Sequence, residues 1–133
     1  MNARNIGYWA TLGLFSLALL GSGVMALTAQ PDMVANYVNL GFPEWFAQWL
    51  GFFKIAGVVV LLLPGLGRLK EWAYAGFTIN LLSASAAHIM AGDPIGEAIP
   101  PLVMLGFALT SWALRPDSRK MAANTDAVAV AAK

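Results

Sequence analysis

The chain contains little charge and no cysteine. Only 11% of its 133 residues are Asp, Glu, Lys or Arg, against about a quarter in soluble domains. The lack of cysteine excludes disulfides, thiol redox relays and thiolate metal sites. The net charge of +1 gives no argument for a nucleic-acid partner. Because 59% of the residues are apolar, the composition indicates a membrane protein.

Four apolar segments are each long enough to cross a bilayer core of about 30 Å as a helix. They cover residues 6–27, 45–63, 72–90 and 98–114. The third segment is the least apolar because it contains Asn80, Ser83, Ser85 and His88. The sequence therefore predicts an all-α fold, an integral membrane four-helix bundle that forms one domain over residues 1–114. Residues 115–133 are polar and then rich in alanine, and they predict a cytoplasmic tail that is mobile from Asp117 onward.

Basic residues gather on one side of this topology. The seven that lie outside the four segments all precede the first segment, join the second to the third, or follow the fourth: Arg4, Arg68, Lys70, Arg115, Arg119, Lys120 and Lys133. The other two loops contain no Lys or Arg. Since Lys and Arg favour the cytoplasmic side, the pattern predicts a multi-pass protein of the inner (plasma) membrane with both termini in the cytoplasm.

Lys54 is the only charged residue within the four segments. A lysine at the centre of a span costs on the order of 2.5–3.5 kcal/mol on insertion scales, so we expect a compensating partner. Asn80 lies at the same depth on the third segment, and His88 follows it by two helical steps of four residues on the same face. Because helical side chains lean toward the N-terminus of their helix, Lys54 is predicted to reach toward the outer side.

Further polar and aromatic residues stand above Lys54 on the second segment. Glu44 and Gln48 are four residues apart, with Trp45 and Trp49 beside them. With Lys54, Asn80 and His88, these four residues predict a ligand-binding cleft between the second and third segments that opens outward. The alternative is structural: Lys54 extends to water or to Glu44, Asn80 joins two helices, and His88 meets the interface.

The segments contain no constellation that predicts a reaction. No carboxylate lies within any of them, and one histidine is insufficient for a metal site. The sequence also lacks paired histidines for haem and a flavin motif. We therefore predict no catalytic residue and no metal site. These absences count against autonomous catalysis without deciding whether the protein is an enzyme, and quinone is the candidate cofactor.

Several short blocks carry a family resemblance. They are Gly41 to Phe46, Gly51 to Gly57, Leu63 to Gly65, Lys70 to Phe77 and Ser85 to His88. Taken in order over residues 6–114, they resemble the DoxX-like family. The resemblance implies a small, mostly bacterial, four-helix membrane protein, and it implies that many members carry an acid where this chain has Asn80.

The wider group to which the resemblance points has divergent functions. Some relatives are linked to quinone-coupled sulfur oxidation or redox-stress complexes, and an animal relative assembles acetylcholine receptors. Three functions are therefore open. The first is an accessory protein that binds a small amphipathic or anionic ligand, a quinone or a lipid, against Lys54. The others are a quinone-linked oxidoreductase subunit and an assembly chaperone, with the lipid bilayer and a membrane protein or a second copy as partners.

Overall fold

The computed structural model describes residues 2–121, which form helices and no strand. The all-α prediction is confirmed for these residues. The α-helices are α1 (Ala3–Leu27), α2 (Pro31–Asn39), α3 (Glu44–Leu62), α4 (Gly67–Met90) and α5 (Ile99–Leu114). Two short 3₁₀ helices, η1 (Ile95–Glu97) and η2 (Asp117–Arg119), flank α5.

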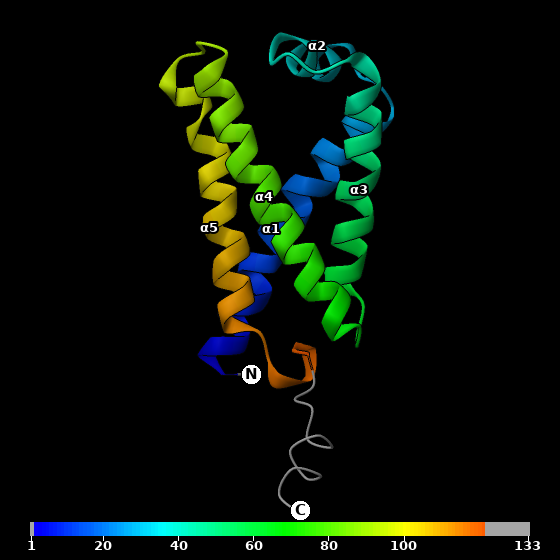
Figure 1. Ribbon diagram of the computed structural model, residues 1–133. Helices are drawn as coiled ribbons and strands as arrows, with labels where there is room; N and C mark the ends of the chain where they lie inside the picture. The colour runs from blue at the N-terminus through cyan, green and yellow to red at the C-terminus, as the bar shows by residue number, and fades with distance from the viewer. Residues whose placement is uncertain (1, 122–133) are drawn as a thin grey trace, which may run out of the picture.

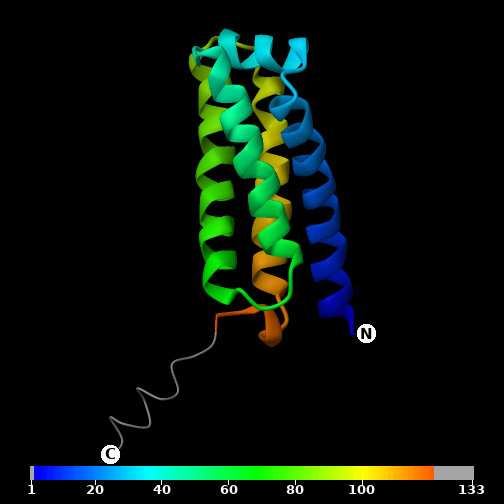
Figure 2. The same cartoon turned by 90° about the vertical axis from the view of Figure 1, so that its right-hand side faces the viewer.

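The four long helices run side by side, and α2 lies across one end of them (Figures 1 and 2). Helix α1 contacts α3 and α5, and α4 contacts the same two helices from the other side. We call the end with α2 and the α4–α5 connection the α2 end. The start of α1, the α3–α4 connection and residues 115–121 lie at the opposite end, which we call the basic end.

Within residues 2–121, three parts of the chain are long and apolar enough to cross a membrane: Ala3–Leu27, Glu44–Leu62 and Ile95–Leu114. They correspond to the predicted first, second and fourth segments. Helix α4 contains the predicted third segment but does not belong to this group, because polar residues lower its hydropathy. Its 24 residues give it ample length, so the crossing of α4 stays a prediction.

Close helix approaches fix how the long helices pack. A Cβ atom on Gly51 of α3 would lie 2.7 Å from the carbonyl oxygen of Gly23 on α1. A Cβ on Gly57 would lie 2.7 Å from the Phe77 ring of α4. Both glycines therefore allow two helices to approach closely. The Phe77 ring also packs edge-on against Phe15, with ring centroids 5.1 Å apart, in the centre of the core.

Two segments differ from the sequence prediction. Residues expected to form only a connection contain α2, which Pro31 begins and whose Tyr37 is buried. Residues 117–121, expected to be mobile, form η2 and pack on the bundle, since a Cβ on Gly67 would lie 2.7 Å from the Lys120 carbonyl oxygen. The rest of the predicted tail, residues 122–133, lies outside the described residues.

Candidate functional site

Lys54 reaches toward the α2 end and is held by two hydroxyl groups. Its ammonium donates to Ser22 Oγ at 2.9 Å and to Tyr37 OH at 3.0 Å, and it lies 5.7 Å from the centre of the Tyr37 ring. Ser22 belongs to α1 and Tyr37 to α2. No described carboxylate forms an ion pair with Lys54. Because an ammonium has three N–H groups, one donor is left over from these two bonds.

A cavity of about 380 Å³ lies between α3 and α4, and both Lys54 and Asn80 line it. The side chain of Asn80 makes no hydrogen bond with any described residue. The remaining wall residues are apolar or aromatic: Leu50, Phe53, Ala56, Gly57, Val60, Leu69, Trp72, Ala73, Gly76 and Phe77. The cavity therefore places two polar groups in an otherwise apolar wall, which is typical of a site for a small amphipathic molecule.

The structure separates His88 from Lys54 and Asn80. His88 Nδ1 lies 2.7 Å from Asp93 Oδ2, and the Asp93 backbone N–H donates to the His88 carbonyl oxygen at 3.1 Å. The chain turns here at Gly92, whose φ of +79° favours glycine. His88 does not line the cavity. The contacts between His88 and Asp93 link the C-terminal end of α4 to the connection that leads to α5.

Glu44, Trp45 and Gln48 also stay outside the cavity and line a separate groove at the α2 end. Gln48 Nε2 donates weakly to the Leu27 carbonyl oxygen, at 3.4 Å. Trp49 lines neither hollow, but its ring packs edge-on against Phe53, a wall residue of the cavity, at a centroid distance of 4.7 Å. The seven predicted site residues thus fall into three places rather than one cleft.

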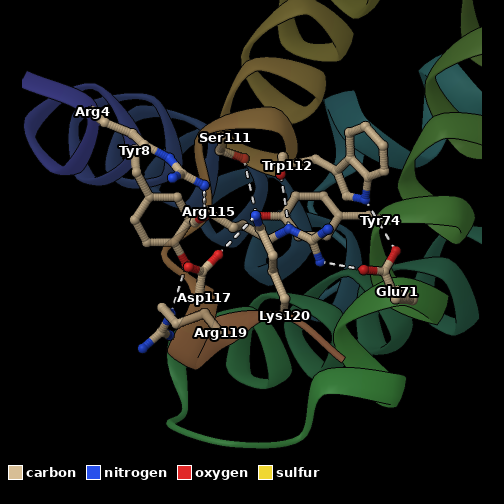
Figure 3. A network of polar contacts seen from close by, with 10 residues as sticks. All are labelled: Arg4, Tyr8, Glu71, Tyr74, Ser111, Trp112, Arg115, Asp117, Arg119 and Lys120. Carbon is tan, nitrogen blue, oxygen red and sulfur yellow. Dashed lines mark hydrogen bonds and ion pairs between the residues drawn. The ribbon is translucent and has the colours of Figure 1, made fainter. Parts of the chain in front are cut away.

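The basic end holds a dense polar network (Figure 3). Glu71 of α4 accepts from Arg115 and, at 3.0 Å, from Trp112 Nε1 of α5. Tyr74 OH and Ser111 Oγ lie 3.1 Å apart in the same layer. Arg4 of α1 donates to the Arg115 carbonyl oxygen at 2.7 Å. These bonds connect α1, α4 and the end of α5.

Two cations close the C-terminal end of α3. The Arg119 guanidinium donates to the carbonyl oxygens of Leu61, Leu62 and Leu63 at 2.8, 3.0 and 3.2 Å, and to Tyr8 OH at 2.7 Å. Lys70, which is fully buried, donates to the carbonyl oxygens of Val60, at 2.8 Å, and Leu63. Carbonyls that lack intrahelical partners and the negative end of the helix dipole both favour cations here.

Burial and neighbouring groups shift the pKa values of Lys70 and Glu71 at the basic end. Burial lowers the pKa of Lys70, and the charge of nearby Arg119 lowers it further. Burial tends to raise the pKa of Glu71, but hydrogen bonds from Trp112 and Arg115 and the charge of Arg115 outweigh it, so that the pKa is below its usual value. Both effects agree with a packed structural network. Lys70, Arg115 and Arg119 therefore form hydrogen bonds with groups of the protein itself.

The family model described as the DoxX-like family matches residues 10–131, nearly the whole chain. The chain belongs to the DoxX-like family. Comparison with curated proteins and with solved structures gives no match. Together with the apolar helices, the family makes this chain a DoxX-like membrane protein.

Sequence reasoning missed both partners of Lys54 in this DoxX-like protein. The sequence pattern gave Ser22 no role beside Lys54, and Tyr37 lay in a segment taken for a connection. A signal for α2 exists, because Val34, Tyr37 and Val38 follow Pro31 at helical spacing. That spacing would have placed Tyr37 on the inner face of a short helix above Lys54.

Proposed function

We propose that this DoxX-like protein is an accessory membrane protein that binds a small amphipathic ligand in the cavity between α3 and α4. The ligand has an electron-rich head, such as a quinone carbonyl or an anionic lipid group, and an apolar body. The observation that carries the proposal is the half-buried Lys54 ammonium, which has a spare N–H group and no carboxylate partner among the described residues, at the wall of an apolar cavity.

Two polar groups are available for the head of the ligand. Lys54 supplies a charged donor, and the free Asn80 amide supplies both a donor and an acceptor. A hydrogen bond to a charged group contributes about 1.5–3 kcal/mol, which corresponds to about tenfold or more in affinity. Phe53 and Trp72 provide flat apolar surface for a ring. The volume of about 380 Å³ suits a small molecule.

The test is the amount of quinone or lipid that copurifies with the full chain in mild detergent, measured by native mass spectrometry. We expect Lys54→Met to lower the bound amount by about tenfold, and Asn80→Leu to lower it as well. The matched control is Arg68→Met, which removes an equal charge from an exposed position outside the cavity. An unchanged bound species in Lys54→Met contradicts the proposal.

In the membrane, we infer four crossings, with the basic end in the cytoplasm and α2 on the outer face. Helix α4 is included because it runs from one end of the bundle to the other and packs against α3 and α5 (Figures 1 and 2). The distribution of basic residues supports the orientation. The lateral position of the cavity between α3 and α4 then gives a lipid-soluble ligand access from the bilayer.

A further inference from the structure

A second hollow of about 670 Å³ lies at the α2 end, distinct from the cavity at Lys54. It is formed where α2 crosses the start of α3. Pro31, Val34 and Val38 of α2 form one side, and Glu44, Trp45 and Gln48 of α3 form the other. Its lining combines a carboxylate, an amide and an indole with apolar side chains, which is an amphipathic surface.

The carboxylate in this groove has no partner within the described residues. Glu44 is the first residue of α3, and its side chain makes no hydrogen bond or ion pair with any described residue. The α2 end carries the acids Asp32, Glu44, Asp93 and Glu97, and no Lys or Arg occurs between Thr28 and Pro43 or between Ala91 and Ala98. Among these acids, Asp93 is engaged by His88. The groove is therefore a negative site without a cation of its own.

An apolar track continues from the groove along the outside of α3. Trp45, Trp49 and Phe52 follow one another at helical spacing on one face. Their exposed fractions are 62%, 53% and 56%. Inside a bilayer such a face meets acyl chains, while indole rings near a helix end sit at the head-group level. The groove and the track together have the shape of a site for a lipid with its head at α2.

We propose that this groove binds a bilayer phospholipid whose head group carries a protonated primary amine. The amine contacts the Glu44 carboxylate and the face of the Trp45 indole. The Gln48 amide oxygen accepts a hydrogen bond from one N–H group of the amine. The acyl chains lie along Trp49 and Phe52.

Charge selects this head group over an anionic one. The Glu44 carboxylate attracts an ammonium group and repels a head group that carries only phosphate and hydroxyls. A cation over a tryptophan face gains further attraction. The selectivity is thus opposite to that of the Lys54 cavity, whose ammonium favours electron-rich heads. The two sites share α3 but no lining residue.

The test titrates the detergent-purified full chain carrying Lys54→Met, which removes the cation that favours anionic heads in the other cavity. Phosphatidylethanolamine and phosphatidylglycerol are titrated separately, and native mass spectrometry reports the bound fractions. We expect phosphatidylethanolamine to bind about tenfold more tightly. Glu44→Gln should remove that preference, and Trp45→Leu should weaken it. Asp32→Asn is the matched control, because it removes an equal charge from the same end outside the groove.

Equal binding of the two lipids by the Lys54→Met chain with Glu44 intact would overturn the proposal. Equal loss of preference in Glu44→Gln and Asp32→Asn would also overturn it, because the general negative field of the α2 end would then suffice. Since the Lys54 cavity has lost its cation in all of these chains, a failure of that cavity and a failure of this groove are distinguishable. Both acidic positions are exposed, and circular dichroism of each variant verifies that it is folded.

Discussion

At the scale of single residues, Lys54 explains how a charge is tolerated in the middle of an apolar helix. Hydrogen bonds to charged groups contribute about 1.5–3 kcal/mol each, and Lys54 makes two of them, to Ser22 and Tyr37. Inserting a central lysine costs about 2.5–3.5 kcal/mol. The two magnitudes are comparable, so the hydroxyls can offset the cost without a counter-ion. Tyr37 also ties α2 to the bundle through this bond.

Tyr37→Phe should therefore lower the free energy of unfolding by about 1.5–3 kcal/mol, because it removes one of the two bonds to the charged group and keeps the ring. In a Lys54→Met background the same change should have almost no effect, since its partner is gone. Thermal unfolding in detergent, followed by circular dichroism, gives both values. Strictly additive losses in the double variant would contradict a direct bond between Lys54 and Tyr37.

The sequence predicted part of this arrangement. Lys54 and Asn80 were placed at equal depth from their positions along two antiparallel helices, and both line one cavity. The direction of the Lys54 side chain also followed from helix geometry. The hydroxyl partners could not be predicted, because a bond between helices depends on their rotation about their own axes, which is set by packing. His88 was predicted to share the helical face of Asn80, but it bonds to Asp93 in the following connection and does not line the cavity.

At the scale of helices, the contact between α1 and α3 depends on the absence of a side chain at Gly51. A Cβ there would lie 2.7 Å from both Gly23 O and Leu27 N, and these are backbone atoms that cannot move independently of α1. Gly13, on the same α1 helix, has no heavy atom within 4 Å of the corresponding position. The two glycines therefore differ in role although both lie in apolar helices.

Gly51→Ala should destabilise the protein by about 1–3 kcal/mol, because the added methyl group forces α1 and α3 apart. Gly13→Ala should leave the stability unchanged or raise it by up to about 1 kcal/mol, since alanine favours helix. Denaturant or thermal unfolding of the two variants in one detergent gives the comparison. Equal effects of the two substitutions would show that helix propensity, rather than the crossing, determines the outcome.

The long helices were predictable because apolar runs of this length admit few other structures in a membrane. Helix α2 was not predicted, since it has only nine residues and contains Asn36 and Asn39, which favour turns over helix interiors. Its position across the α2 end is maintained by tertiary contacts. The Tyr37 ring packs against Phe42 and Phe46 at centroid distances of 6.4 and 6.1 Å.

At the scale of the whole molecule, charge divides the bundle into two unlike ends. Among the described residues, the basic end carries Arg4, Arg68, Lys70, Arg115, Arg119 and Lys120 together with the acids Glu71 and Asp117. The α2 end carries four acids and no Lys or Arg. Because Arg and Lys resist transfer across the membrane, this division predicts one orientation for the entire bundle.

Reporter fusions test the orientation directly. Fusions after Lys70 and after Lys133 should behave as cytoplasmic, and fusions near Asp32 and Asp93 should behave as external. Opposite locations for the fusions after Lys70 and after Lys133 would contradict a crossing by both α4 and α5. The same experiment decides whether α4, the least apolar of the long helices, spans the bilayer.

The hydrogen bonds from Arg119 to the end of α3 have a consequence for biosynthesis. Arg119 is translated after all four long helices, yet its guanidinium contacts the last carbonyls of the second of them. While the ribosome is still making α4 and α5, the C-terminal turn of α3 lacks this partner. The basic end of the bundle can therefore be completed only after η2 has emerged from the ribosome.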